Sequence, residues 1–102
     1  MVAYWAARPK INNPTQYKKY SDLVPSILQK FGGRIVARGG RFKILEGPER
    51  FRRFVLIEFS SLEKAVARYE SPEYLEAALH RRKEGASELE IAIVEGIGRD
   101  PS

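Results

Sequence analysis

The sequence predicts an α+β fold, because stretches with the twofold period of strands alternate with stretches of helical period. Two glycine pairs mark the change of period. Gly32-Gly33 is typical of a helix end, and Gly39-Gly40 of a break inside a strand. The predicted order is strand, helix, strand, strand, helix, strand, over residues 2–7, 14–31, 34–45, 52–59, 62–85 and 88–95.

Length and composition indicate one domain over residues 1–97, followed by a short tail at 98–102. The chain has 102 residues, of which 43% are hydrophobic and 30% charged, as in ordinary globular proteins. No apolar run approaches the ~20 residues of a membrane span, and the N-terminus shows no secretion signal. We therefore expect a cytoplasmic protein with no membrane association.

The cysteine and histidine counts limit the chemistry. The chain has no cysteine, which excludes disulfides, thiolate metal sites and cysteine nucleophiles. A single histidine leaves little for a metal besides carboxylates, and we expect neither a metal nor another cofactor. The 18 Lys and Arg residues exceed the 13 Asp and Glu residues, which is compatible with an anionic ligand or nucleic acid. The basic residues are interleaved with acids, however, as on a solvated surface.

Residues 2–7 are apolar at every position, which is typical of a strand covered on both faces. Asn13-Pro14 then offers a helix cap and a first-turn proline. Pro25 predicts a kink in this helix, and Gly32 or Gly33 ends it. The apolar positions of the helix recur at helical spacing: Tyr17, Tyr20, Val24, Ile27, Leu28 and Phe31.

A hairpin is predicted in the middle of the chain. The strand 34–45 is interrupted at the second glycine pair, a turn at 46–49 reverses it, and the return strand 52–59 is apolar on both faces from 54 to 57. Ser60 and Glu63 have the spacing of a capping box for the next helix.

In the second half, Leu62, Ala65, Val66 and Tyr69 predict the apolar side of that helix. Ser71-Pro72 restarts it, and it runs to about Gly85. A last strand of alternating pattern closes at Glu95-Gly96.

This order of elements is that of a ferredoxin-like βαββαβ domain. Such a domain carries both helices on one face of a four-stranded antiparallel sheet. Because the central strands here are apolar on both faces, the other face would expose a large apolar patch to water. We therefore predict a homodimer in which two sheets pair face to face.

Several short motifs resemble a known family. They are Gly32-Gly33-Arg34, Arg38-Gly39-Gly40, Leu45-Glu46-Gly47, Leu56-Ile57-Glu58-Phe59, Ser71-Pro72-Glu73-Tyr74 and Val94-Glu95-Gly96. In this order they resemble the domain-of-unknown-function family numbered 1330 (DUF1330), over residues 2–97. The resemblance implies a dimeric α+β barrel, in a superfamily that also holds monooxygenases, haem-degrading enzymes and lactone isomerases. It implies no reaction for the family itself, so whether this protein is an enzyme stays open.

Glu58 is the first candidate for chemistry, because a carboxylate inside an apolar central strand needs a partner. The predicted hairpin puts Arg38 opposite Glu58 or one step away. The two residues then form either a structural ion pair or a catalytic pair. In the second case Glu58 accepts a proton, with its pKa tuned by Arg38, or Arg38 binds a ligand carboxylate.

Four helix tyrosines are candidate ligand-binding residues at a cleft between helices and sheet: Tyr17, Tyr20, Tyr69 and Tyr74. Their pattern favours core packing with each hydroxyl at a polar neighbour, and ligand binding is the alternative. Arg81, or its neighbour Arg82, is a candidate for binding the anion of a small acid or aromatic ligand. The family resemblance favours Arg81, the arginine after Ser-Pro-Glu-Tyr, and Glu95 is its alternative partner. Trp5 departs from the smaller residues of the family, which suggests a pocket lining particular to this protein.

Haem and RNA are two other ligand classes that parts of the sequence suggest. Haem-degrading relatives use Asn, His and Trp, and this chain has Asn12, Asn13, His80 and Trp5, but its tryptophan lies on the wrong strand for haem. The alternative function is RNA binding, since the RNA recognition motif shares the strand order. The corresponding stretch, residues 50–55, lacks the glycine and the first aromatic of that motif, so we do not expect nucleic acid as a partner.

Overall fold

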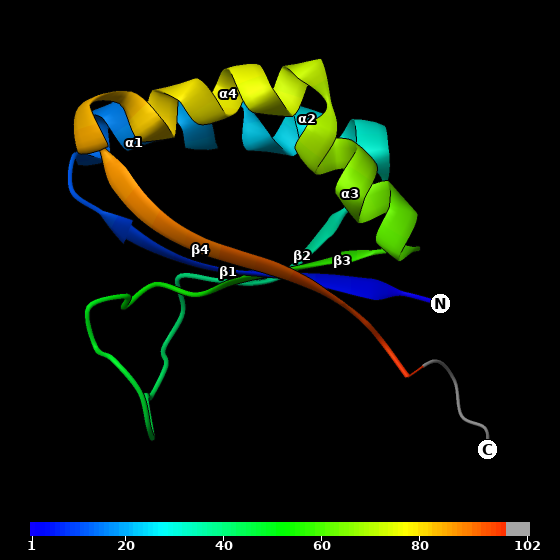
Figure 1. The fold of residues 1–102 in the computed structure, drawn as a ribbon, viewed down its shortest axis with the longest axis horizontal. Coiled ribbons are helices and arrows are strands. Elements are labelled where there is room, and N and C mark those ends of the chain that lie inside the picture. Colours follow the sequence, from blue (N-terminus) through cyan, green and yellow to red (C-terminus); the bar gives the residue numbers. More distant parts are fainter. Residues whose placement is uncertain (98–102) are drawn as a thin grey trace.

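The computed structural model describes residues 1–97, and the tail predicted at 98–102 lies outside this range. Figure 1 shows the elements in chain order. They are β1 (Ala3–Ile11), α1 (Pro14–Ser21), α2 (Val24–Phe31), β2 (Arg34–Arg38), β3 (Val55–Phe59), α3 (Leu62–Glu70), α4 (Pro72–Arg82), the 3-10 turn η1 (Lys83–Gly85) and β4 (Ser87–Glu95).

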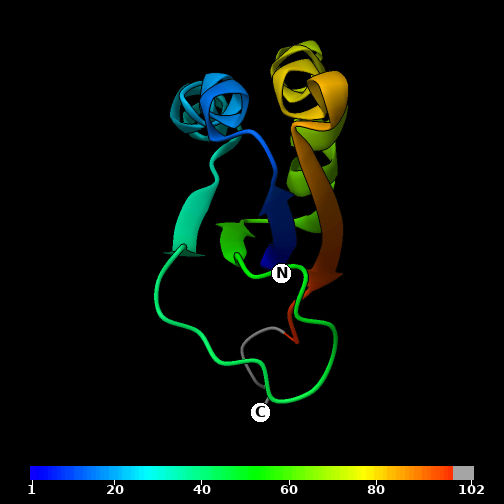
Figure 2. The same cartoon turned by 90° about the vertical axis from the view of Figure 1, so that its left-hand side faces the viewer.

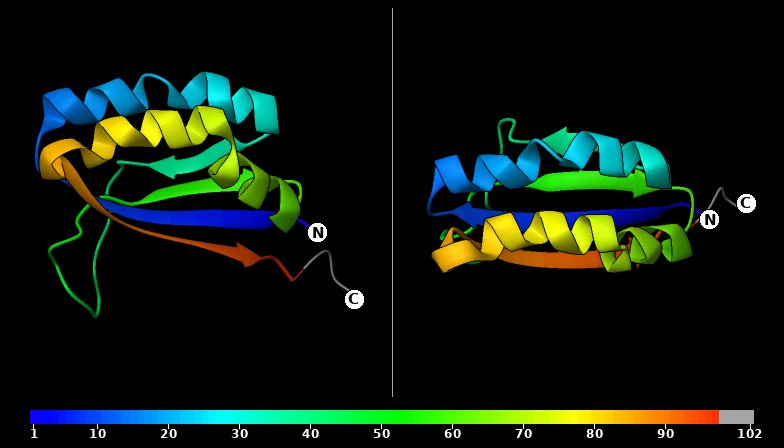
Figure 3. Two further views of the ribbon diagram at one scale, coloured as in Figure 1. Left: turned by 45° about the horizontal axis from the view of Figure 1, so that its top comes forward. Right: turned by 90° about the horizontal axis from the view of Figure 1, so that it is seen from above.

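The four strands form one antiparallel sheet in the order β2-β3-β1-β4. All the helices lie on one face of this sheet, as Figure 1 and Figure 2 show from two directions. Seen from above in Figure 3, α1 and α2 run alongside α4 and α3. The arrangement confirms the predicted ferredoxin-like α+β fold.

β1 lies between β3 and β4 and organises the core. Its residues Ala3, Trp5 and Ala7 are buried and face the helices. β1 extends past the predicted end at residue 7, because β4 pairs with it as far as Ile11. β4 ends at Glu95, where the last strand was predicted to close.

The helix predicted for residues 14–31 is two helices rather than one kinked helix. Proline lacks an N–H, and its ring clashes with the carbonyl four residues earlier. For Pro25 that residue is Ser21, where α1 ends. The predicted start is confirmed, since the Asn13 side chain caps α1 by accepting a hydrogen bond of 3.1 Å from the Gln16 N–H.

The first glycine pair ends α2 as predicted. Gly32 has a φ of +72°, in the left-handed region that favours glycine. The Gly33 N–H donates to the Leu28 carbonyl oxygen at 2.9 Å. Gly33 is also closely packed, since a Cβ there would lie 2.6 Å from Leu28 Cδ2 and 2.9 Å from Phe59 Cε1.

The predicted hairpin is shorter than expected. β2 stops at Arg38 and β3 begins at Val55, so residues 39–54 form a loop instead of the strands predicted to 45 and from 52. Gly39, with a φ of +62°, turns the chain out of β2, so the second glycine pair ends a strand and does not interrupt one. The loop projects beyond the sheet on the side away from the helices (Figure 1).

Two serines begin the helices of the second half. The Ser61 Oγ accepts a hydrogen bond of 3.1 Å from the Lys64 N–H, so the cap is Ser61 and the predicted box of Ser60 and Glu63 does not form. Ser71 caps α4 in the same way, as predicted.

The sheet face opposite the helices carries exposed apolar side chains. Leu56 lies opposite Ala6 and Val94 opposite Tyr4, on the face that alternates with the buried residues of β1. Leu56 is 39% exposed and Val94 is 59% exposed. We call this surface the open face.

Gly33→Ala is expected to lower the free energy of unfolding by about 1–3 kcal/mol, because the added methyl group overlaps the buried Leu28 and Phe59 side chains. Urea denaturation followed by the fluorescence of Trp5 measures this change. Gly40→Ala is the control, since a Cβ there meets no atom within 4 Å, and a change within about 0.5 kcal/mol is expected. Equal losses in the two variants would contradict this packing argument.

Candidate functional site

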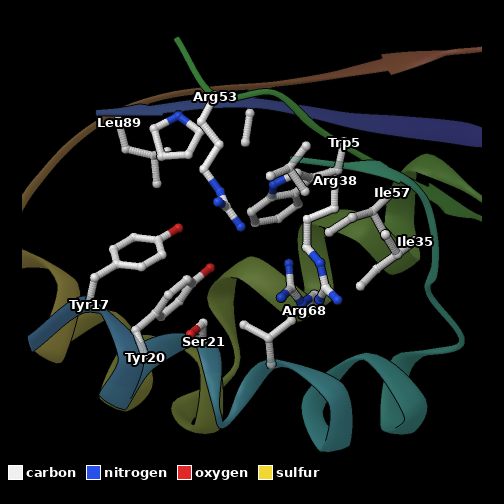
Figure 4. A pocket seen from close by; sticks show the side chains of 14 residues that line it. Trp5, Tyr17, Tyr20, Ser21, Ile35, Arg38, Arg53, Ile57, Arg68 and Leu89 are labelled. Atoms are coloured by element: carbon white, nitrogen blue, oxygen red, sulfur yellow. The ribbon is translucent and has the colours of Figure 1, made fainter. Parts of the chain in front are cut away.

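A cavity of about 50 Å³ lies between α1, α2 and the helix-facing side of the sheet (Figure 4). Its walls are largely apolar, and its polar side chains are two tyrosines, one serine and three arginines. None of its lining residues is acidic. The lining consists of Trp5, Ala7, Pro9, Tyr17, Tyr20, Ser21, Val24, Ile35, Arg38, Arg53, Val55, Ile57, Arg68 and Leu89.

Arg68 brings a positive charge into the core beside this cavity. It lies on the buried side of α3, three residues after Ala65, and is only 1% exposed. Its guanidinium carbon lies 4.6 Å from the ring centroids of both Trp5 and Tyr74. None of its three guanidinium nitrogens has a hydrogen-bond partner among the described residues. Because a buried charge without a partner is costly, the position is suited to receive an anion.

The electrostatic surroundings of Arg68 reinforce this conclusion. Burial lowers the pKa of its guanidinium, and the hydroxyls of Tyr20 and Tyr74 only partly offset that effect. Tyr20 lies near the guanidinium but does not meet hydrogen-bond geometry with it. In the described part of the chain no carboxylate forms an ion pair with Arg68.

A β-bulge directs Arg38 to the cavity. Ile35 lies opposite Ile57, but Ala37 lies opposite Leu56, so β2 contains one extra residue at this point. In a regular ladder Arg38 would share the open face with Arg34, because alternate residues point to the same side. The extra residue instead places Arg38 opposite Val55, whose side chain also lines the cavity.

Arg53 reaches the cavity from the end of the loop, just before β3. Its guanidinium lies beside Gly39, where a Cβ would be 3.4 Å from Nη1. Its buried Nε has no hydrogen-bond partner in the described residues. Burial raises the pKa of the neighbouring Tyr17 hydroxyl, against the opposing charges of Arg53 and Arg81, so Tyr17 stays protonated at neutral pH.

A chain of hydroxyls runs from the cavity into the core behind it. The Tyr20 and Tyr74 hydroxyl oxygens are 3.2 Å apart, and Arg81 Nη2 donates to the Tyr74 oxygen at 3.1 Å. Burial raises the pKa of Tyr74 strongly, and Tyr20 adds to this effect. The Tyr74 hydroxyl therefore stays neutral and links Tyr20, which lines the cavity, to Arg81, which does not.

The predicted ligand-binding residues fall in three places. Trp5, Tyr17 and Tyr20 line the cavity. Tyr74 and Arg81 are buried behind it, so they support the wall without facing the space. The remaining candidate, Tyr69, packs against Trp5 with ring centroids 5.8 Å apart, and its hydroxyl accepts a hydrogen bond of 3.4 Å from Arg82 Nη2.

The predicted pairing of Glu58 with Arg38 is wrong. Glu58 lies opposite Arg34, whose Nη2 is 3.0 Å from Glu58 Oε1. The expected register assumed a hairpin with strands to 45 and from 52, and the bulge and the long loop change it. Glu58 and Arg38 therefore lie on opposite faces of the sheet. Glu95 is not the partner of Arg81 either, since no ion pair joins them among the described residues and Arg81 donates to Tyr74.

Arg53 and Arg68 were absent from the predicted site, although the sequence contains a signal for each. Arg68 follows Ala65 by three residues and so shares its helix face, but the predicted apolar side included the exposed Val66 and omitted Arg68. Arg53 has the same period-two position as Ile57 and Phe59, both buried. The spacing of buried positions was counted over apolar residues, and these arginines were left out because arginine is seldom buried in a core.

The residues considered for haem or RNA binding are not grouped at the cavity. His80 lies near the end of α4 and is not among the lining residues. Of residues 50–55, compared above with an RNA-binding motif, only Val55 lies in β3. None of the described helices has the length and apolar character needed to cross a membrane.

Solved structures with this fold come from several bacteria. A protein of unknown function from Rhodopseudomonas palustris is 21% identical and superposes with a TM-score of 0.69, over 94% of this chain and 82% of that one. A dimeric ferredoxin-like protein of unknown function from Jannaschia sp. CCS1 is 11% identical, with a TM-score of 0.70 over 94% of this chain and all of the other. SnoaB, a cofactor-independent oxygenase from Streptomyces nogalater, is 14% identical, with a TM-score of 0.55 over 99% and 98% of the two chains.

These similarities show the fold, since all three identities are low. No curated protein matches the sequence. The family model described as "Domain of unknown function (DUF1330)" matches residues 2–97, nearly the whole chain. The chain therefore belongs to the DUF1330 family.

Proposed function

We propose that the protein binds a small organic anion in the cavity between the helices and the sheet. The observation that carries this proposal is Arg68, a buried guanidinium that lines the cavity and lacks both a hydrogen-bond partner and an ion-pair partner among the described residues. An anion would supply the missing partners, and charge-assisted hydrogen bonds to guanidinium are among the strongest in proteins.

A carboxylate is the group that fits this position. Trp5 and Tyr74 both pack against the Arg68 guanidinium, so the N–H groups at its edge are what remains for a ligand. That edge matches a planar carboxylate in a bidentate arrangement. A volume of about 50 Å³ holds a few water-sized groups, so only the head of a ligand would be enclosed. The apolar walls formed by Val24, Ile35 and Val55 would contact its hydrocarbon part.

The cavity favours binding over proton-transfer chemistry. Its lining contains neither a carboxylate nor a histidine, and burial raises the pKa of Tyr17, which makes this hydroxyl a poor base. A cofactor-independent reaction like that named for SnoaB would thus depend on the ligand's own reactivity, with the arginines stabilising negative charge.

We also propose that two copies of the chain pair through the open face. Leu56 and Val94 are exposed on this surface, and pairing two sheets would remove them from water. A solved structure of the same fold, that from Jannaschia, is described as dimeric. The helices and the cavity lie on the other side of the sheet, so pairing would leave the site of each copy intact.

Arg68→Met is expected to weaken the binding of benzoate roughly tenfold to a hundredfold, because hydrogen bonds to charged groups contribute about 1.5–3 kcal/mol. Trp5, the only tryptophan, lies in the cavity wall and reports binding by its fluorescence. Benzamide, which has the same shape without the charge, is expected not to bind.

The melting temperature of the ligand-free protein separates this role from a structural one. If Arg68 serves binding, Arg68→Met removes an unpaired buried charge and leaves the melting temperature equal or higher. Lys64→Met removes an exposed charge from the same helix and should alter neither binding nor melting. A marked fall in melting temperature with benzoate binding intact would contradict the proposal.

Leu56→Lys is expected to convert a dimer into a monomer, because a lysine charge in an apolar interface has no partner. Light scattering at micromolar concentration measures the mass. Leu79→Lys is the matched control, since Leu79 is 62% exposed on α4, a helix on the opposite side of the sheet, and it should remain dimeric. A monomeric parent protein would exclude pairing through the open face.

A further inference from the structure

Two more arginines, Arg38 and Arg53, line the same cavity and are nearer to solvent than Arg68. Arg53 is half-buried and Arg38 is exposed, whereas Arg68 is buried. Both come from the end of the β2–β3 pair, where the Gly39 N–H donates to the Phe54 carbonyl oxygen at 3.2 Å. Figure 4 shows the three guanidinium groups at one cavity, Arg38 from β2, Arg53 from the end of the loop before β3, and Arg68 from α3.

Neither Arg38 nor Arg53 has a carboxylate partner in the part of the chain that the structure describes. Four arginines elsewhere do, with N–O distances from 2.9 Å to 3.8 Å, while Arg81 and Arg82 donate to tyrosine hydroxyls. These ion pairs are Arg8–Glu90, Arg34–Glu58, Arg50–Glu88 and Arg52–Glu49. All three arginines that line the cavity therefore carry a charge that no described carboxylate neutralises.

The charge of the lining exceeds what one carboxylate neutralises. Three guanidinium groups line the space with no acidic residue, and the Tyr17 hydroxyl stays neutral. A single carboxylate on Arg68 would leave the charges of Arg38 and Arg53 without a partner. A second negative group on the ligand would compensate this charge and fill their donors.

We propose that the ligand is a short dicarboxylate, with one carboxylate at Arg68 and the other between Arg53 and Arg38. This inference rests on the proposed function and names the ligand class of the same site. The spacer between the two carboxylates lies against the apolar side chains of Val55 and Ile57, which belong to the same wall. A spacer of a few carbon atoms suits a cavity this small, because a longer one has no room to fold.

The test compares pairs of ligands that differ by one charge: succinate with succinamate, and glutarate with glutaramate. Binding is measured by Trp5 fluorescence and by calorimetry in the full chain. Each dicarboxylate is expected to bind about tenfold or more tightly than its half-amide, since the half-amide loses one set of charge-assisted hydrogen bonds. In the double variant Arg38→Met with Arg53→Met, the two members of each pair should bind equally, at the affinity of the half-amide.

Arg41→Met is the matched control, because it removes one arginine charge from the exposed part of the same loop, outside the cavity lining. It is expected to keep the preference for the dicarboxylate. Equal affinity for both members of a pair in the parent protein would overturn the dicarboxylate inference, while binding that depends on Arg68 would leave the proposed function standing. Binding of neither member, together with no binding of benzoate, would overturn both.

Discussion

The packing of Trp5 between the sheet and the helices is the interaction on which the rest of the structure depends. Its ring lies 6.3 Å from Phe59 of β3, 5.8 Å from Tyr69 of α3 and 5.5 Å from Tyr74 of α4, measured between centroids. The central strand is thus joined through one side chain to its neighbour strand and to the second helical pair. Aromatic groups of this size dominate the energetics of small cores.

The same packing creates the site. Arg68 lies over the rings of Trp5 and Tyr74, so the aromatic core holds a positive charge by cation–π contact and not by a carboxylate. Such contacts offset part of the cost of burial but leave the guanidinium donors unfilled. The fold therefore leaves a buried guanidinium without hydrogen-bond partners next to a cavity, and a bound anion would supply them.

Glu58 and Arg38 show how small differences in register change a predicted site. Both residues were identified from the sequence, and both sit where charges interrupt apolar strands. One extra residue in β2 separates them, placing Arg38 at the cavity and leaving Glu58 to pair with Arg34 on the open face. A period of two makes strand sites sensitive to single-residue bulges, which leave no clear mark in local sequence.

The order of elements, the fold class, the family and the aromatic side of the cavity could be predicted from the sequence. These features depend on local periodicity, helix caps and glycines at element ends, which short stretches encode: Tyr17 and Tyr20 share a helical stripe, and Asn13 and Ser71 cap helices. The charged side of the cavity follows from the three-dimensional fold. Arg38, Arg53 and Arg68 come from a bulged strand, a loop end and a helix, and no local pattern encodes that these three line one cavity with no acidic residue among its described lining.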